Sequence, residues 1–295
     1  PNVIFVITDD QHRSEFNFLP EGQDNQGNGV NLTPNLDELV SEGVHFANMY
    51  CPSPVSTPSR YSCLTGRFAS RSLSPKPKDD NQVAVHWNTK VTEATTTFPE
   101  ILQNQGYYTG AVGKIHGIKP GARQKVALDA DPRDPAVEKA LRENQQNLAK
   151  QVKKAGFDYA ESLYDGNPYG VEAPDELRVH NLDWIFKGAL DFIDQADKEQ
   201  KPFFLWVATT VSHSPYQPER SYNSNPLATP AGYLKDTISI MPPRHTIPKR
   251  IKNADIPQDH FNRKCNLLWL DDGMGAIRDK LEKLGIKDNT VIIYF

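Results

Sequence analysis

The length and composition of the chain are those of an ordinary globular protein. It has 295 residues, of which 38% are hydrophobic and 24% charged, and its formal net charge is −4. This slight acidic excess gives no reason to expect nucleic acid as a partner. No apolar run approaches the roughly 20 residues of a membrane span, and we expect no signal peptide because the first predicted strand begins next to the N-terminus. Three cysteines cannot form a disulfide framework.

The first half of the chain alternates between strand and helix patterns. Residues 2–8 are almost entirely apolar and β-branched, which predicts a strand buried on both faces. Residues 33–43 predict a short helix with Thr33 as its N-cap. A second helix is predicted over residues 98–105, and residues 107–113 predict the strand that follows it.

The second half repeats this alternation. Residues 135–154 predict a polar helix. Apolar residues at three-and-four spacing predict a helix over 182–193, and the apolar run 203–208 predicts a strand after it. The longest regular apolar stripe predicts a helix over 267–284, and residues 290–295 predict a further buried strand.

Helices that alternate with buried strands predict an α/β fold. We expect a mostly parallel central sheet with helices on both faces, and we interpret residues 1–295 as one domain. Two less regular stretches, 68–96 and 118–180, are interpreted as surface excursions from that domain.

Polar residues follow three of the predicted strands. Asp9 and Asp10 come after the first strand, Lys114 and His116 after the second, and His213 after the run at 203–208. In parallel sheets, ligands bind beyond the carboxyl ends of the strands, so these side chains could converge on one site. Adjacent carboxylates are hard oxygen ligands that suit Ca²⁺ or Mg²⁺, although a solvated pair of aspartates in a turn is the simpler interpretation of that motif alone.

A twelve-residue motif carries the most specific signal. Residues 56–60 read Ser-Thr-Pro-Ser-Arg, and Leu-Thr-Gly-Arg follows at 64–67. This motif resembles the signature of the formylglycine-dependent (type I) sulfatases of the alkaline phosphatase superfamily, in which a Cys or Ser at the first position is oxidised to formylglycine. Residues 33–50, 113–116 and 212–215 also look like sulfatase segments, in the order of that family.

The resemblance implies an alkaline-phosphatase-like α/β fold and a divalent metal, Ca²⁺ rather than Mg²⁺. It also implies a hydrated formylglycine at position 56, made by a maturase. An aldehyde hydrate near a metal is a better nucleophile than the hydroxyl of an ordinary serine.

By the same resemblance, each candidate residue has a role. Asp9 and Asp10 would hold the metal, and Arg60 would fix the modified Ser56. Lys114 would contact the sulfate. His116 would assist the hydrate, and His213 would protonate the leaving alcohol. For each of these three residues, a polar side chain at a surface turn is the alternative interpretation.

The sequence departs from the family pattern in two places. Ser56 stands where many members have Cys; it is either the residue of a natural Ser-type sulfatase or a replacement of Cys that gives an inactive protein. The sequence ends at Phe295, where family members continue into a turn with further metal ligands and then into a smaller C-terminal domain. We therefore expect an incomplete catalytic domain, from a protein that the resemblance places in the periplasm or outside the cell.

These motifs lead to a sulfatase that acts on a carbohydrate sulfate ester, with a sulfated glycan or small molecule as its partner. An alternative within the same superfamily is a phosphonate or phosphate ester hydrolase, because formylglycine and a metal can also attack phosphorus. A third hypothesis is a catalytically silent relative that binds glycans.

Overall fold

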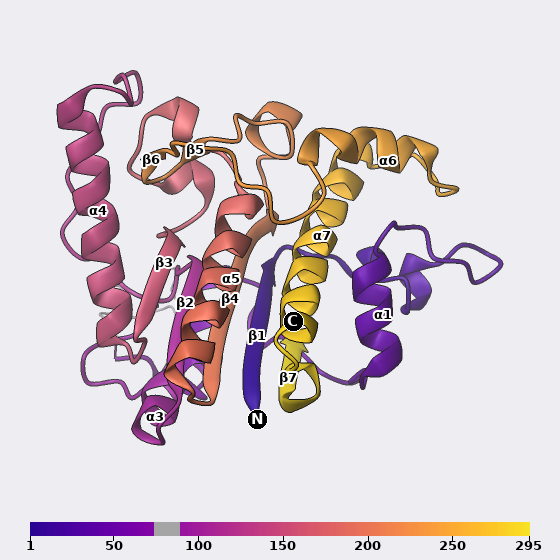
Figure 1. The fold of residues 1–295 in the computed structure, drawn as a ribbon, viewed down its shortest axis with the longest axis horizontal. Coiled ribbons are helices and arrows are strands. Elements are labelled where there is room, and N and C mark those ends of the chain that lie inside the picture. The colour runs from indigo at the N-terminus through magenta and orange to yellow at the C-terminus, as the bar shows by residue number, and fades with distance from the viewer. Residues whose placement is uncertain (74–88) are drawn as a thin grey trace, which may run out of the picture.

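The computed structural model describes residues 1–73 and 89–295, and a parallel sheet lies at its centre (Figure 1). The sheet has the strand order β3-β2-β4-β1-β7, and every neighbouring pair in it is parallel. This arrangement confirms the predicted α/β class. The strands are β1 (Asn2–Asp9), β2 (Tyr108–Lys114), β3 (Tyr159–Tyr164), β4 (Phe203–Ser212) and β7 (Thr290–Tyr294).

Helices cover both faces of this sheet, as the sequence predicts. Figure 1 shows α5 (Leu182–Glu199) and α7 (Phe261–Lys283) in front of the strands. The opposite face packs against α2 (Ser56–Thr65), α3 (Phe98–Asn104) and α4 (Pro135–Lys154). The remaining α-helices and strands of the described residues are the short helices α1 (Pro34–Glu42) and α6 (Ile247–Asn253), which pack against α7, and a hairpin of β5 (Ala228–Thr229) and β6 (Gly232–Tyr233).

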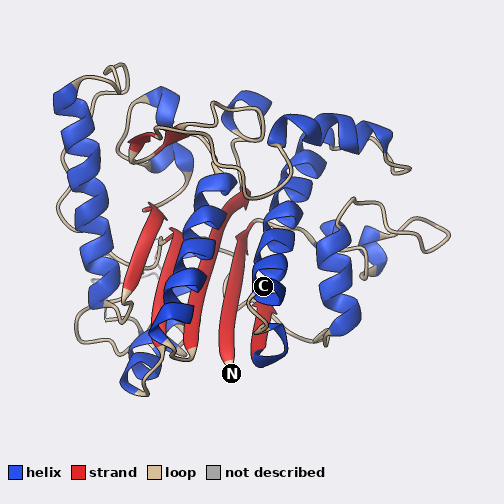
Figure 2. Cartoon of the chain, viewed as in Figure 1, coloured by secondary structure: helices blue, strands red, loops and turns tan. Residues whose placement is uncertain are grey.

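The two faces have separate hydrophobic cores because strand side chains alternate in direction. In β4, the side chains of Leu205 and Val207 enter the core under α5 and α7, whereas those of Phe204 and Trp206 enter the core on the opposite side. Every residue of β4 is buried. Burial on both faces explains why this strand reads as a continuous apolar run in the sequence. Figure 2 shows the strands side by side, with helices in front of them.

The interpretation of residues 118–180 as a surface excursion is wrong. The stretch contains β3, which pairs with β2, and its later part contributes Val171, Leu177 and Val179 to the core. Glu161 and Ser162 interrupt the apolar run of β3, so the stretch lacks a strand signal. In the other stretch, Val91 and Thr95 are buried, and residues 74–88 lie outside the described part of the chain.

Two local predictions also need correction. The strand at 290–295 exists as β7, but it is not buried, because it lies at the sheet edge and Val291 is 48% exposed. Thr33 precedes α1, but its side chain makes no N-cap hydrogen bond. Instead, the Asp271 carboxylate of α7 accepts hydrogen bonds from the backbone N–H groups of Asn35 and Leu36. A carboxylate at this position satisfies free helix donors and complements the helix dipole.

Among the helices of the described ranges, none is both long and apolar enough to cross a bilayer.

Candidate active site

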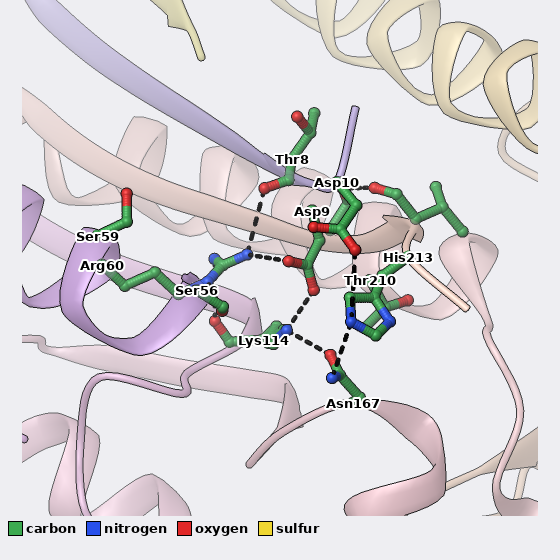
Figure 3. Close-up of polar contacts among 12 residues, drawn as sticks. Thr8, Asp9, Asp10, Ser56, Ser59, Arg60, Lys114, Asn167, Thr210 and His213 are labelled. Carbon is green, nitrogen blue, oxygen red and sulfur yellow. Dashed lines mark hydrogen bonds and ion pairs between the residues drawn. The ribbon is translucent and has the colours of Figure 1, made fainter. Parts of the chain in front are cut away.

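Polar side chains meet at the carboxyl edge of the sheet, where ligands bind in parallel α/β folds. Asp9 ends β1, Lys114 ends β2, Asn167 follows β3 and His213 follows β4. Figure 3 shows these four side chains pointing toward one another. Asn167 and His213 line a cleft of about 620 Å³, which Ser56 also lines.

Three of the predicted residues form a buried charge cluster, Asp9, Arg60 and Lys114, beside this cleft. The ammonium group of Lys114 donates to Asp9 Oδ2, and an Arg60 guanidinium nitrogen lies 3.8 Å from Asp9 Oδ1. The three side chains are no more than 4% exposed. Buried charges are tolerated only when they are paired, and these are paired with one another.

Burial and pairing act in opposite directions on the ionisation of the cluster. Burial raises the pKa of Asp9, but Lys114 and Arg60 outweigh this effect and hold its pKa below the ordinary value. Burial lowers the pKa of Lys114 to about 8, although Asp9 opposes the shift. Asp9 is therefore an anion and Lys114 a cation near neutral pH. The predicted contact of Lys114 with sulfate stays a prediction, because its ammonium group contacts Asp9 and Asn167 here.

The chain conformation before Lys114 depends on a glycine. Gly113 has φ of 85°, and a Cβ at this residue would lie 1.8 Å from the carbonyl oxygen of Ala208. The β2–β3 register also shifts between Val112 and Gly113. No larger side chain fits this bend, so the position before Lys114 requires glycine.

The signature motif folds into α2, which brings Ser56 to the cleft. The helix begins at Ser56 and ends at Gly66, whose left-handed conformation (φ of 64°) is a common helix C-cap. Arg60 lies one turn after Ser56, and its Nε donates to Ser56 Oγ at 3.1 Å. Other nitrogens of Arg60 donate to the carbonyl oxygens of Thr8 and Lys114 at 3.3 and 3.4 Å. Arg60 therefore ties α2 to the ends of β1 and β2 (Figure 3).

His116 also lines the cleft. Burial, together with the positive charges of Lys90, Lys114 and Arg60, lowers its pKa to about 3. The ring is therefore neutral near neutral pH, and its Nδ1 is buried with no hydrogen-bond partner in the described part of the chain. A neutral imidazole can accept a proton from a neighbouring group.

His213 lies at the junction between the cleft and the two adjacent aspartates. Its Nε2 is 3.2 Å from Asn167 Nδ2 and 3.5 Å from Asp10 Oδ2, and its Nδ1 is 2.9 Å from the carbonyl oxygen of Ser214. Because an amide N–H and a carbonyl oxygen face the two nitrogens, the neutral ring carries its proton on Nδ1 and accepts at Nε2. The Asp10 carboxylate also lies beside Nε2 of this ring.

Asp10 differs from its neighbour Asp9 in exposure and conformation. Its side chain is 51% exposed, and its φ is 57°, in the left-handed region that Asp tolerates better than most residues. Arg263 at the start of α7 donates to the Asp10 carbonyl oxygen at 3.0 Å and pairs with Glu15 at 2.8 Å. Arg263 therefore links the turn at Asp10 to α7.

The sequence did not identify Asn167, which connects several site residues. Its Oδ1 accepts from Lys114, and its Nδ2 contacts His213 and donates to Tyr169 Oη at 2.8 Å. Asp165, Tyr169 and Arg123 also line the cleft and were not identified. The available signal was the polar segment after β3, which could be interpreted only once β3 itself was recognised as a strand.

Two carboxylates at this edge suit a hard divalent cation in chemical type. Asp9 and Asp10 are adjacent, and the amide oxygen of Asn167 lies close to Asp9 through their shared contact with Lys114. Ca²⁺ takes about six to eight oxygen ligands, however, and the described residues contain no group of three or more His, Cys, Asp or Glu side chains that could hold a metal. These residues therefore fit part of a calcium site.

Comparisons with known proteins show which family the chain resembles in sequence and fold. A relative from Escherichia coli, the uncharacterized sulfatase YdeN, is 29% identical over 280 residues, which are 89% of this chain and 42% of YdeN. The N-acetylglucosamine-6-O-sulfatase of Bacteroides thetaiotaomicron is 25% identical over 74% of this chain and 32% of its own length.

A solved structure from work on the metabolism of multiple glycosaminoglycans by Bacteroides thetaiotaomicron has the same fold. Its TM-score is 0.61 at 21% identity, over 100% of this chain and 62% of that one. The chain thus spans less than two thirds of each of these proteins. A family model described as Sulfatase matches residues 1–295 in full. The chain belongs to the sulfatase family.

Proposed function

We propose that this chain carries the nucleophile and the proton-transfer groups of a sulfatase that hydrolyses a carbohydrate sulfate ester, with formylglycine made from Ser56. The observation that supports it most directly is the position of Ser56. Its hydroxyl contacts Arg60 at 3.1 Å and faces a cleft that His116 and His213 also line. The carbohydrate part has support from the name of the N-acetylglucosamine-6-O-sulfatase that is similar to this chain.

The proposal includes two groups that this chain would receive, the formylglycine from a maturase and a Ca²⁺ ion. When present, a hydrated formylglycine supplies one hydroxyl that attacks sulfur and a second that later expels sulfate, and Ca²⁺ supplies positive charge for the sulfate oxygens. Asp9 and Asp10 would hold the ion. The guanidinium of Arg60 would hold an oxygen of the modified residue, as it holds Ser56 Oγ.

The two histidines would have different roles. His116 is a neutral ring, because burial and the nearby positive charges lower its pKa to about 3, and it would accept a hydrogen bond from a hydroxyl group of residue 56. His213 would deliver a proton from Nε2 to the leaving oxygen of the ester, since the Nδ1–H is used by the Ser214 carbonyl. Lys114 adds positive charge behind this site and keeps Asp9 ionised.

Sulfate release from a panel of sulfated sugars and aryl sulfates tests the proposal. The protein should first be co-expressed with a formylglycine-generating maturase, and mass spectrometry should show the loss of two hydrogens at Ser56. We expect turnover of at least one sugar sulfate. Activity confined to aryl sulfates contradicts the carbohydrate assignment, and higher kcat/KM for a matched phosphate ester contradicts the sulfatase assignment.

A further inference from the structure

The cleft has an outer wall, formed by Arg123, Asp165 and Tyr169, that the catalytic roles above do not use. An Arg123 guanidinium nitrogen lies 2.5 Å from Asp165 Oδ2, and the two side chains are 40% and 10% exposed. Arg123 therefore remains accessible from the cleft, whereas Asp165 is held in one place.

Both Asp165 and Arg123 are held by regular elements, Asp165 by β3 and Arg123 by α4. Asp165 follows the last residue of β3 directly. The backbone on either side of Arg123 is fixed by α4, because Asn147 Nδ2 donates to the Ala122 carbonyl at 3.0 Å and Asn144 Nδ2 donates to the Gln124 carbonyl at 2.9 Å. A group held on regular elements can position a ligand more sharply than one on a free loop.

Tyr169 joins the outer wall to the catalytic residues. Its ring is 5.9 Å from the ring of His213, and its hydroxyl accepts from Asn167 at 2.8 Å. Tyr169 is 53% exposed, so the aromatic ring is available to a ligand beside the proton donor. A ligand that carries its leaving oxygen at His213 would therefore contact Tyr169 with the adjoining part of its skeleton.

The chemistry of the outer wall fits a ring that carries hydroxyl groups. A sugar hydroxyl both donates and accepts, and the Arg123–Asp165 pair offers donors and acceptors next to each other. Because Asp165 balances the charge of Arg123, the pair favours a neutral polyol over a second anionic group. The exposed face of Tyr169 suits the apolar C–H face of a sugar ring.

We propose that Arg123, Asp165 and Tyr169 form a subsite that binds the sugar ring bearing the sulfate ester, through the hydroxyl groups next to the scissile bond. This inference rests on the proposed function and deepens it. It assigns sugar recognition to residues outside the signature motif and separates it from recognition of the sulfate.

Kinetics with two substrate classes test this subsite. Arg123→Ala, Asp165→Asn and Tyr169→Ala should be compared in the matured enzyme, with sulfated N-acetylglucosamine and other sulfated monosaccharides as one class and para-nitrophenyl sulfate as the other. Loss of a hydrogen bond to a charged group corresponds to about a tenfold or larger change in kcat/KM. For Arg123→Ala and Asp165→Asn we expect that loss in kcat/KM for the sugar sulfates and less than about a twofold change for the aryl sulfate, which has no hydroxyl group for the pair to bind. Tyr169→Ala should lower kcat/KM for both classes, because an aryl group held at His213 would also contact the Tyr169 ring.

Asp191→Asn is the matched control, because the Lys187–Asp191 pair of α5 is a surface ion pair that does not line this cleft. The control variant should leave kcat/KM unchanged for both substrate classes. Equal losses for both classes in Arg123→Ala and Asp165→Asn, or no loss in any of the three variants, overturn the subsite. An opposite result, in which Asp165→Asn improves the affinity for sugars with two sulfates, favours an anion site and also overturns it.

A binding measurement separates this inference from the proposed function. Titration calorimetry with the protein that retains unmodified Ser56 needs no turnover, and it uses the same sulfated monosaccharides. Binding that is weakened about tenfold by Arg123→Ala supports the subsite even if the matured enzyme releases no sulfate. Absence of binding to any of these sugars overturns the subsite, whatever the activity toward aryl sulfates.

Discussion

The buried charge cluster and the outer wall contain similar pairs in different surroundings. Asp9 pairs with Lys114 and Arg60 where all three side chains are almost fully enclosed, whereas Asp165 pairs with the partly exposed Arg123. Charges in the enclosed cluster depend on one another, because removing one leaves its partners buried and uncompensated. An accessible ion pair contributes little to stability, and its geometry can change when a ligand binds. The comparison distinguishes charges that the fold encloses from charges that a ligand can reach.

The largest expected effect comes from Ser56, which lies between the two regions. Ser56→Ala removes the proposed nucleophile, and we expect sulfate release to fall by about 10⁴-fold or more, as for loss of a nucleophile in other hydrolases. The unfolding midpoint in urea should stay close to that of the parent protein, because the side chain is small and lies at the cleft. Retention of more than about a tenth of the activity by this variant would remove Ser56 from the mechanism.

The adjacent aspartates provide a direct test of the buried cluster. Asp9→Ala leaves Lys114 and Arg60 without their carboxylate, so the free energy of unfolding should fall by about 3–5 kcal/mol. Asp10→Ala removes a side chain that is 51% exposed, and its effect on stability should be less than about 1 kcal/mol. Urea unfolding in the presence of a chelator measures both variants without a contribution from bound metal. Equal losses of stability contradict the distinction between enclosed and accessible charges.

The same aspartates should respond alike in metal binding. If both hold Ca²⁺, each alanine variant weakens Ca²⁺ affinity in calorimetric titration of the longest available form of the protein. Asp10→Ala is the more informative variant, because its fold should remain intact. Ca²⁺ affinity that does not change in Asp10→Ala excludes this residue as a ligand.

A histidine near the cluster gives a test through pH. His180 is fully buried, its Nδ1 contacts Thr210 Oγ1 at 2.8 Å, and burial lowers its pKa to about 3. The unfolded chain binds a proton at this residue below about pH 6.5, whereas the folded chain does not until about pH 3. Stability from this residue is therefore fully present above about pH 6.5 and is lost as the pH falls toward 3.

His180→Gln should remove that dependence. The stability difference between parent and variant should change by about 2 kcal/mol between about pH 7 and about pH 5, measured by urea unfolding. His245→Gln serves as the control, since His245 is exposed. A parent and His180→Gln variant with parallel stability curves over this range would falsify the assignment of a buried neutral ring.

Patterns in the sequence were sufficient for the strands that are apolar throughout and for the residues that follow them. The run at 203–208 predicts β4, and His213 lies near its end because parallel strands deliver their following residues to one edge. β3 could not be predicted in the same way. Ser162 adopts φ of 53° near a register shift, and Glu161 interrupts the apolar pattern, so nothing in the local sequence indicates a strand.

Contacts between residues far apart in the chain could not be predicted from the sequence either. Lys114 and Asp9 are separated by 105 positions, and only the strand order places the ends of β1 and β2 on either side of β4. The motif resemblance assigned Lys114 to the sulfate, whereas its contact with Asp9 follows from the need of a buried carboxylate for a nearby cation. Asn167 was missed because it follows β3, and the sequence did not reveal β3 as a strand.

The smallest expected effect on activity belongs to Asn167, the residue that joins the buried cluster to the outer wall. Asn167→Ala removes the contacts with Lys114, His213 and Tyr169 together, so the proton donor and the aromatic ring lose a shared support. We expect kcat to fall about tenfold for sugar sulfates and aryl sulfates alike, since His213 serves both. This pattern differs from that of Arg123→Ala, which should affect sugar sulfates alone. If Asn167→Ala changed only KM for sugars, Asn167 would belong to the outer wall and its contact with His213 would have no catalytic consequence.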